Sequence, residues 1–443
     1  MYFSAVLLAL SGGYLTVKSG FYQFLHLKSV FNETFGKLIR TKSLEGFKAM
    51  SIALGSTIGI GNIIGVAAAI CIGGAGAVFW LLVTGFIGMI TKYAEIYICV
   101  ENTNINNRTS GGPMYVIRDV CKGKLKLFGG VFAAACIAAS YFAGNLVQAK
   151  SMYEFARFGF SIDIISVTLF TLPILALILF GKDKLYQNFS AVFVPLMSVM
   201  YIIATIVLIS VNIKNVPNAI ISVFTNALGI RQTVGGFSGA VLSLAIRTGI
   251  MKGLFTNEAG MGSSPIAHCS AKVTDPHTQG CWGIIEVFID TVVVCMLTAI
   301  AILSSDIYLN NTFSDPFALV CNIFSDVFGT AGLKALSFAA YCFAFASIVG
   351  WSFYGIKALC FFSDNKTFKS VYIILFLGMI PLSNAVGGKT MWALTDIFNS
   401  MMLIPNSTLL LFAGGSAVKN LNKKERKRND LQFMPEKMLC RKK

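Results

Sequence analysis

Charged residues are scarce in this chain. Asp, Glu, Lys and Arg make up only 13% of its 443 residues, whereas hydrophobic residues make up 55%. The mean hydropathy is +0.71. A soluble domain of this length needs more surface charge, so the composition excludes one and indicates an all-α polytopic membrane protein.

Metal-binding and nucleotide-binding patterns are missing as well. The three histidines, His26, His268 and His277, are too scattered for a metal cluster, and the 11 cysteines show no short paired spacing of a zinc or redox motif. The sequence has neither a phosphate-binding glycine-rich loop nor a large soluble nucleotide-binding domain. If the chain transports a solute, we therefore expect that it does not hydrolyse ATP to do so.

Long apolar runs dominate what is present. At roughly 20 residues for each helix, plus loops, the chain has room for about 11 transmembrane helices. The predicted spans are 2–17, 47–72, 77–99, 128–156, 162–180, 190–212, 237–270, 283–304, 335–361, 369–386 and 391–415. The span at 237–270 is the least regular of them.

The loops between these spans carry an uneven charge. Basic residues gather in 18–46, in 100–127 and in the tail at 416–443, while the loop 305–334 has three Asp against one Lys. Because Lys and Arg collect in short cytoplasmic loops, we predict an inner-membrane protein with its N-terminus outside and its C-terminus in the cytoplasm. We interpret the net charge of +16 as a determinant of membrane topology and of contact with anionic lipid, and not as a nucleic-acid-binding surface.

Two segments, 55–65 and 253–265, place glycines and polar residues inside otherwise apolar spans. Hydrocarbon cannot solvate an open backbone, so such breaks persist only where they are buried in protein or line a water-filled cavity. One broken helix in each half of a polytopic chain is a pointer to the binding site of a secondary transporter. Close helix packing at the glycines is the competing explanation for either break alone.

A broken helix presents two opposite dipole ends. Free N–H groups attract a carboxylate, and free carbonyls hold a small cation. Gly59 and Gly61 allow a close backbone approach, and Asn62 adds an amide oxygen. Thr256 and Asn257 are residue types that cap a helix N-terminus, with Glu258 in the following turn. Together these groups suit a zwitterion with a sodium ion nearby.

Further polar residues lie within the predicted spans. Intramembrane ionisable residues face the bundle interior and are candidates for function. The pair Lys92 and Glu95 we interpret instead as pairing or snorkelling at a helix end. The remaining polar or pocket candidates are Asn145, Gln148, Asp290, Thr291, Ser347 and Trp351.

At these residues the chain resembles the alanine or glycine:cation symporter family, also called sodium:alanine symporters. The resemblance covers nearly the whole chain in order, and its longest motif is the second break. The matching segments are GIGNIIGVA at 59–67, GGAGAVFW at 73–80, TKYAE at 91–95, GGPMY at 111–115, GNLVQA at 144–149, GLFTNEAGMGSSPIA at 253–267, FIDT at 288–291, GW at 350–351 and DIFN at 396–399.

The resemblance implies two inverted five-helix repeats, with two broken helices and one extra N-terminal helix. The corresponding units are 1–46 with the extra helix, 47–236 and 237–415 with the repeats, and 416–443 with the basic tail. It also implies Na⁺-driven uptake of alanine, glycine or a similar small amino acid. The implied substrate residues are Gly59, Ile60, Gly61, Gln148, Phe255, Asn257, Gly260, Met261 and Trp351. One implied sodium site uses Asn62 and Thr256, and the other uses the carbonyls of Gly55 and Ile58 with Ser347.

Two positions depart from the family pattern. Ile60 stands where the family usually has Thr, and Ala346-Ser347 stands where it usually has two hydroxyl residues. These departures leave the substrate open, with serine or glutamine as alternatives. A proton-coupled symporter is a further alternative, because the carbonyl sites lack a diagnostic titrating residue. A channel is disfavoured because no filter-like motif repeats. An intramembrane enzyme or receptor is disfavoured because no embedded His/Asp metal set or Ser–Lys pair appears.

Overall fold

The computed structural model describes residues 2–106, 108, 110–181, 183–229, 238–270 and 275–421, and over these residues the regular structure is entirely helical. The longer helices are α1 (Tyr2–Lys18), α5 (Glu45–Thr57), α7 (Gly76–Ile105), α9 (Leu127–Tyr141), α10 (Val147–Phe160), α11 (Ile164–Leu179), α12 (Asp183–Val211), α13 (Val216–Ala227), α14 (Ser238–Asn257), α16 (Pro276–Val287), α19 (Pro316–Phe362), α20 (Lys366–Leu382) and α21 (Gly388–Leu409).

Shorter elements complete the chain. The short α-helices are α2 (Tyr22–Leu25), α3 (Leu27–Phe31), α4 (Lys37–Thr41), α6 (Val66–Gly73), α8 (Pro113–Val120), α15 (Ser264–His268), α17 (Met296–Ser304) and α18 (Asp306–Asn310). Five wider, π-type turns are η1 (Asn32–Gly36), η2 (Gly61–Gly65), η4 (Phe142–Leu146), η6 (Phe288–Cys295) and η7 (Leu410–Gly414). Such turns occur often at functional sites.

Six helices within the described residues are long and apolar enough to cross a membrane. The pair of helices at Glu45–Thr57 and Gly61–Gly73, bent by 53°, makes up a seventh span. The shorter apolar helices at Val6–Lys18 and Ile164–Leu179 also coincide with predicted spans. The all-helical class predicted from composition is confirmed.

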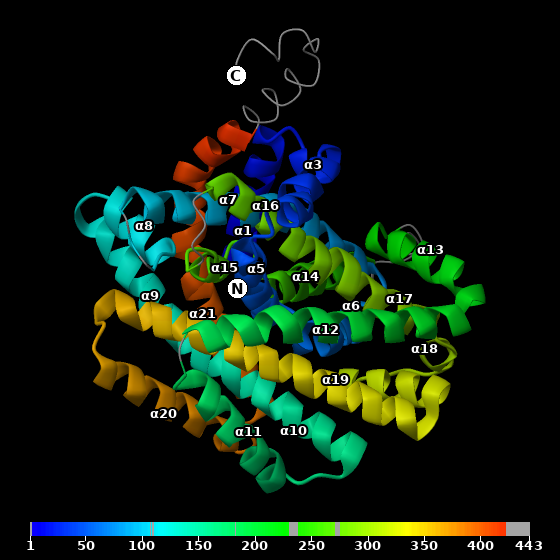
Figure 1. The fold of residues 1–443 in the computed structure, drawn as a ribbon. Helices are drawn as coiled ribbons and strands as arrows, with labels where there is room; N and C mark the ends of the chain where they lie inside the picture. The colour runs from blue at the N-terminus through cyan, green and yellow to red at the C-terminus, as the bar shows by residue number, and fades with distance from the viewer. Residues whose placement is uncertain are drawn as a thin grey trace.

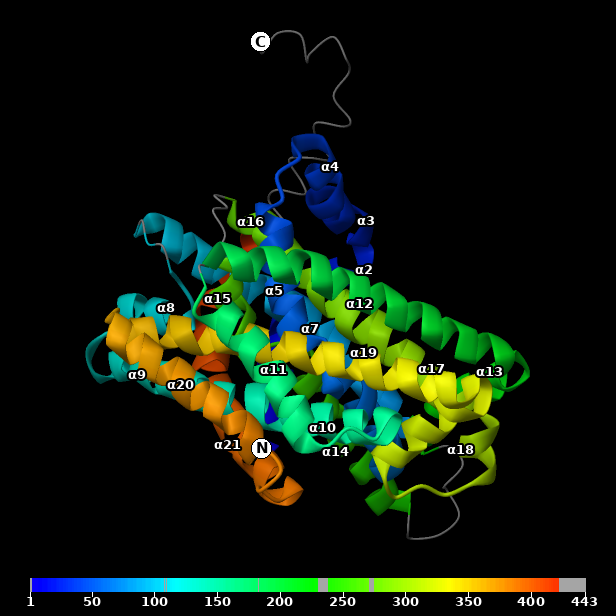
Figure 2. The same ribbon diagram turned by 60° about the horizontal axis from the view of Figure 1, so that its bottom comes forward.

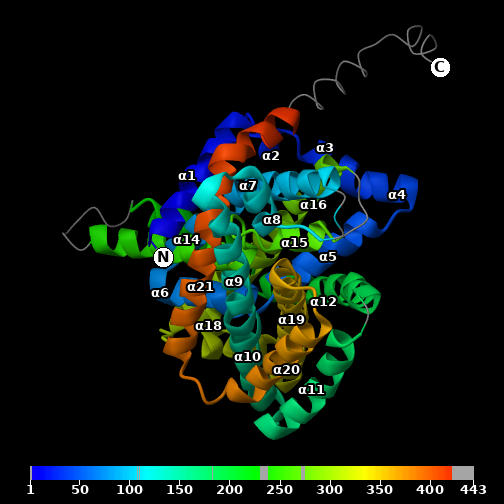
Figure 3. The same cartoon turned by 90° about the vertical axis from the view of Figure 1, so that its left-hand side faces the viewer.

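Equivalent helices of the two predicted repeats pack against each other. α7 packs on α16, α9 and α10 pack on α19, and α11 packs on α20. The two broken helices run in opposite directions: the first half of each contacts the second half of the other, α5 with α15 and α14 with α6 (Figure 1). α1 lies outside this arrangement, against α7 and α21 (Figure 3). This pairing brings both breaks to the middle of the bundle.

The connections between the spans are more helical than we predicted. The segment 18–46 contains α2, α3, η1 and α4, which lie on one side of the bundle next to α16 (Figure 2). The segment 305–334, predicted to be a long loop, contains α18 and the first part of α19. Gly329 interrupts α19 with a positive φ of 61°, a conformation that glycine adopts without steric penalty.

Candidate functional site

The first broken helix stops and restarts around Ile58. α5 ends at Thr57, Ile58 has an extended ψ of 97°, and the chain becomes helical again at Gly61. The side chain of Asn62 bridges this break, because its Oδ1 accepts a hydrogen bond from the backbone N–H of Gly59 at 3.1 Å. Protein groups thus satisfy part of the backbone that the break exposes.

The second break is a left-handed turn. α14 ends at Asn257, Glu258 and Gly260 have positive φ values of 52° and 82°, and α15 starts at Ser264. We predicted that Thr256 and Asn257 cap the second half of this helix. That prediction was wrong, because Thr256 and Asn257 are the last two residues of α14, the first half of the broken helix. Glu258, which follows them, adopts a left-handed conformation that ends a helix.

A small cavity lies where the two breaks meet. Its volume is about 10 Å³, which is roughly what one water molecule requires. An amino acid needs more room, so its binding requires a change of conformation. The lining residues are Ser56, Thr57, Gly61, Ala143, Gln148, Phe255, Glu258, Trp351 and Asn399.

Six of the predicted substrate residues lie in or beside this central cavity. The four that line it are Gly61, Gln148, Phe255 and Trp351. The backbone N–H of Ile60 lies 3.4 Å from Gln148 Oε1, to which it donates. A Cβ on Gly59 would lie 3.3 Å from the same oxygen and 2.5 Å from Ser347 Oγ, so only glycine allows this approach.

The other three predicted substrate residues do not line the central cavity. Asn257 Oδ1 accepts a hydrogen bond from Ala259 N at 3.0 Å. The carbonyl of Gly260 accepts one from Asn406 Nδ2 at 2.9 Å. Met261 lines a second cavity, between α14 and α21. After the left-handed turn, Gly260 and Met261 lie beside α21.

A thin partition separates these two cavities. Phe255 and Asn399 line both of them. The Phe255 ring lies 5.0 Å from that of Trp392, and Lys252 Nζ lies 4.2 Å from the centre of the Trp392 ring.

Three oxygens converge at the second predicted sodium site. Ser347 Oγ donates to the carbonyl of Gly55 at 3.2 Å and lies 3.5 Å from that of Ile58. All three residues are buried. A hydroxyl and two carbonyls are hard oxygen ligands of the kind that a small cation prefers, so these residues fit the sodium ion that the resemblance implies.

The first predicted sodium site has an acidic neighbour. Asn62 Nδ2 donates to Asp290 Oδ1 at 2.7 Å and to the Asp290 carbonyl at 3.1 Å, and Thr291 Oγ1 donates to the other carboxylate oxygen at 2.8 Å. Thr256 Oγ1 donates to Gly253 O at 2.9 Å. The side chain of Asp290 thus places a buried acidic group next to Asn62.

The predicted substrate and sodium sites did not include three residues that the structure places there. Glu258 and Asn399 line the central cavity. Asp290, which the sequence analysis named only as a polar candidate within a span, bonds to Asn62. A signal for each was present: Glu258 lies within the second break, and the other two lie in motifs that carry the resemblance. Ionisable residues at membrane depth are themselves such a signal.

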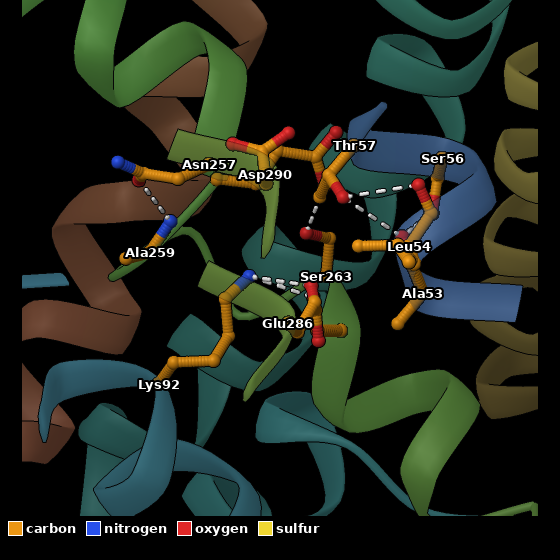
Figure 4. A network of polar contacts seen from close by, with 12 residues as sticks. Ala53, Leu54, Ser56, Thr57, Lys92, Asn257, Ala259, Ser263, Glu286 and Asp290 are labelled. Atoms are coloured by element: carbon orange, nitrogen blue, oxygen red, sulfur yellow. Dashed lines mark hydrogen bonds and ion pairs between the residues drawn. The ribbon is translucent and has the colours of Figure 1, made fainter. Parts of the chain in front are cut away.

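The expected pairing of Lys92 with Glu95 is present, but the interpretation of Lys92 as a snorkelling residue at a helix end was wrong. Its side chain is fully buried, with Nζ 3.2 Å from Glu286 Oε1 and 4.0 Å from Glu95 Oε1. Figure 4 shows the Lys92 side chain pointing towards Glu286. Lys92 Nζ also donates to Ser264 Oγ at 2.7 Å, and Ser264 is the first residue of α15. α7 and α16 pack closely enough here to exclude water from the whole group.

This charge network ties the second break to its neighbours. Ser264 Oγ donates to Glu286 Oε1 at 2.7 Å, and Asn406 on α21 donates to Glu95 Oε2 at 2.8 Å as well as to the carbonyl of Gly260. The network therefore fixes the position of α15 relative to α7, α16 and α21.

Removing one partner of a buried ion pair leaves an uncompensated charge. We predict that Lys92→Met destabilises the protein by about 3–5 kcal/mol, and that Lys92→Met combined with Glu286→Gln recovers part of the loss. Denaturation of the purified protein measures both. The control is Lys334→Met, at an exposed lysine, which should change stability little. Equal stability of Lys92→Met and that control would contradict the assigned role.

Comparisons with known proteins agree with this architecture. The family model described as "Sodium:alanine symporter family" matches residues 1–436. The sodium/alanine symporter AgcS of Methanococcus maripaludis is 33% identical over 424 residues, which cover 93% of this chain and 92% of AgcS. The probable sodium/glutamine symporter GlnT of Bacillus subtilis is 31% identical over 407 residues, covering 90% of this chain and 83% of GlnT.

A solved structure supports the fold. The crystal structure of MhsT in complex with L-phenylalanine has a TM-score of 0.58 and 17% sequence identity, and the match covers 84% of this chain and 87% of MhsT. The predicted architecture of two inverted repeats with broken helices is confirmed. The chain is a polytopic membrane transporter and not an enzyme, and it belongs to the sodium:alanine symporter family.

Proposed function

We propose that this protein is a secondary active transporter that couples the uptake of a small neutral amino acid, such as alanine or glycine, to the inward movement of Na⁺. The observation that carries the proposal is the meeting of two broken helices at one closed cavity lined by Gly61, Gln148, Phe255 and Trp351. Backbone N–H groups and carbonyls of the first break lie close together there, and in this structure the side chains of Asn62, Gln148 and Ser347 bond to them. A zwitterion with a cation needs both kinds of group.

In this proposal the substrate lies between the breaks. Its carboxylate binds the open backbone at Gly59, Ile60 and Gly61, and its side chain points towards Trp351. Glu258, a buried acid in the lining, takes the ammonium group. Of the residues predicted from the resemblance, Asn257, Gly260 and Met261 shape the turn and the second cavity instead of contacting the amino acid.

Two sodium ions accompany the substrate. One binds near Asn62 and Thr256, with Asp290 balancing its charge. The other binds Gly55, Ile58 and Ser347, whose oxygens already converge. The relative AgcS carries sodium and alanine in its name, which supports this pairing of cargo.

Two finer alternatives follow from particular residues. The name of the relative GlnT supports glutamine as a second candidate substrate. The buried acids near the breaks favour a proton as a second candidate coupling ion. Serine is a further candidate substrate, because it differs from alanine by one hydroxyl.

The proposed placement in the cell follows the charge of the loops. The protein lies in the inner cell membrane, with residue 1 outside and the basic tail at 416–443 in the cytoplasm. Residues 422–443 of this tail lie outside the described residues. The repeats are 47–236 and 237–415, and the extra helix lies in 1–46. The partners are the amino acid, Na⁺ and the lipid bilayer, without nucleic acid.

Uptake of labelled alanine into proteoliposomes should require a Na⁺ gradient. Ser347→Ala should raise the Na⁺ concentration for half-maximal uptake about tenfold or more, because a cation loses an oxygen ligand. Ala346→Thr, which adds a hydroxyl, should lower that concentration. The control is Ser352→Ala on the same helix, whose hydroxyl bonds only Val349 O among the described contacts. Equal uptake without Na⁺, driven by a proton gradient, would refute sodium coupling.

Trp351→Ala should widen the cavity and admit longer amino acids. Each methylene that becomes accommodated changes discrimination by about 1–3 kcal/mol, so uptake of methionine relative to alanine should rise at least tenfold. Trp392→Ala is the matched control, because Trp392 contacts Phe255 but does not line the central cavity. A Trp351→Ala protein that takes up alanine normally and still rejects methionine would place the pocket elsewhere.

A further inference from the structure

A third, larger cavity lies on the side of the bundle that the loop charges place in the cytoplasm. It lies between three elements: α4, the start of α5, and α16. Its volume is about 220 Å³, whereas that of the central cavity is about 10 Å³. Trp282 forms one wall. Hydroxyl groups line the remainder, from Thr34, Thr41, Ser43 and Thr278.

This α4–α16 cavity has a positive and a negative group on facing walls. Lys37 Nζ, on α4, lies 3.4 Å from Asp275 Oδ2 and 2.7 Å from Thr278 Oγ1. Thr278 Oγ1 in turn donates to Asp275 Oδ2 at 2.8 Å. Because Lys37 and Asp275 both remain about a third exposed, a ligand can reach either group at little desolvation cost.

One wall of the cavity carries a hydrogen-bond acceptor, the side-chain oxygen of Gln279, that has no donor among the described residues. Gln279 is fully buried, and its Oε1 has no hydrogen-bond partner among the described residues. This oxygen lies at the wall beside Gly46, where a Cβ would be only 3.1 Å from it. A buried, unsatisfied carbonyl oxygen is costly, and a ligand N–H group would satisfy it.

We propose that the α4–α16 cavity binds a second molecule of the transported class, a small zwitterionic amino acid. Its carboxylate pairs with Lys37, and its ammonium group lies between Asp275 and Gln279 Oε1. A phosphate or another simple anion would leave these two acceptors facing negative charge, so the arrangement disfavours it. This assignment rests on the proposed function for the class of ligand.

The cavity is joined to the second break by a buried chain of polar contacts. Gln279 Nε2 lies 2.6 Å from His268 Nδ1, and His268 Nε2 lies 3.3 Å from Glu286 Oε2. His268 ends α15, and Glu286 pairs with Lys92.

The cavity is also close to the first broken helix, because α4 is followed within a few residues by α5, the first half of that helix. An amino acid in the cavity would therefore hold α4 and α5 against α16. It would slow the return of the transporter to its outward-facing form, as any ligand that prefers one conformation does. The released amino acid would thus inhibit its own further uptake.

Equilibrium binding of labelled alanine to the purified full chain in Na⁺ tests this site. The parent protein should show two saturable components. Lys37→Gln and Ser43→Trp should each weaken one component at least tenfold, the first by removing a charge and the second by filling the cavity from its exposed rim. The control Lys28→Gln removes the same charge at an exposed position outside the cavity and should keep both components. In vesicles preloaded with alanine, initial uptake should fall for the parent and less for Lys37→Gln.

The outcomes separate the two proposals. A single component with normal uptake, or two components that persist in both cavity variants, refutes the second site and leaves the proposed function intact. A component that Lys37→Gln removes, in a protein without uptake, supports the second site and refutes the proposed function. Loss of the second component in Ser43→Trp alone, with Lys37→Gln unaffected, refutes the pairing of the carboxylate with Lys37. Absence of any alanine binding refutes both.

Discussion

An open peptide backbone at membrane depth must find its hydrogen-bond partners within the protein, because hydrocarbon offers none. Both breaks of this chain obey that constraint. Asn62 accepts from Gly59 N at the first break, and Asn406 donates to Gly260 O at the second. The carbonyls of Gly55 and Ile58 accept from the Ser347 hydroxyl, and these three oxygens are the groups that a transported cation can use. The same constraint explains why the broken helices lie at the centre of the bundle, crossed by the helices of the opposite repeat.

Buried charge sets a second requirement on the same region. Lys92 and Glu286 are removed from water and lie 3.2 Å apart, and Ser264 connects this pair to the start of α15. A buried pair of this kind gives little net stability but makes any other arrangement expensive. It therefore holds the short half of the second broken helix in one position.

The sequence contained enough to predict the fold class, the two breaks and the triad of Gly55, Ile58 and Ser347, because glycines in apolar runs and family motifs are local signals. It could not place Met261, because the left-handed turn at Glu258 and Gly260 redirects the chain. The pairing of Lys92 with Glu286 was equally inaccessible, since it joins residues from different repeats. The helices within 18–46 are short, and packing on α16 stabilises them more than their own residues do.

The central claim is that sodium and the amino acid bind together where the broken helices meet. Equilibrium binding of alanine at several Na⁺ concentrations, paired with binding of Na⁺ at several alanine concentrations, tests it most directly. Linkage requires each ligand to raise the affinity of the other by the same factor, and we predict a factor of about five or more, typical of coupled sites. Alanine affinity that is unchanged between sodium-free and sodium-saturated protein would contradict the account.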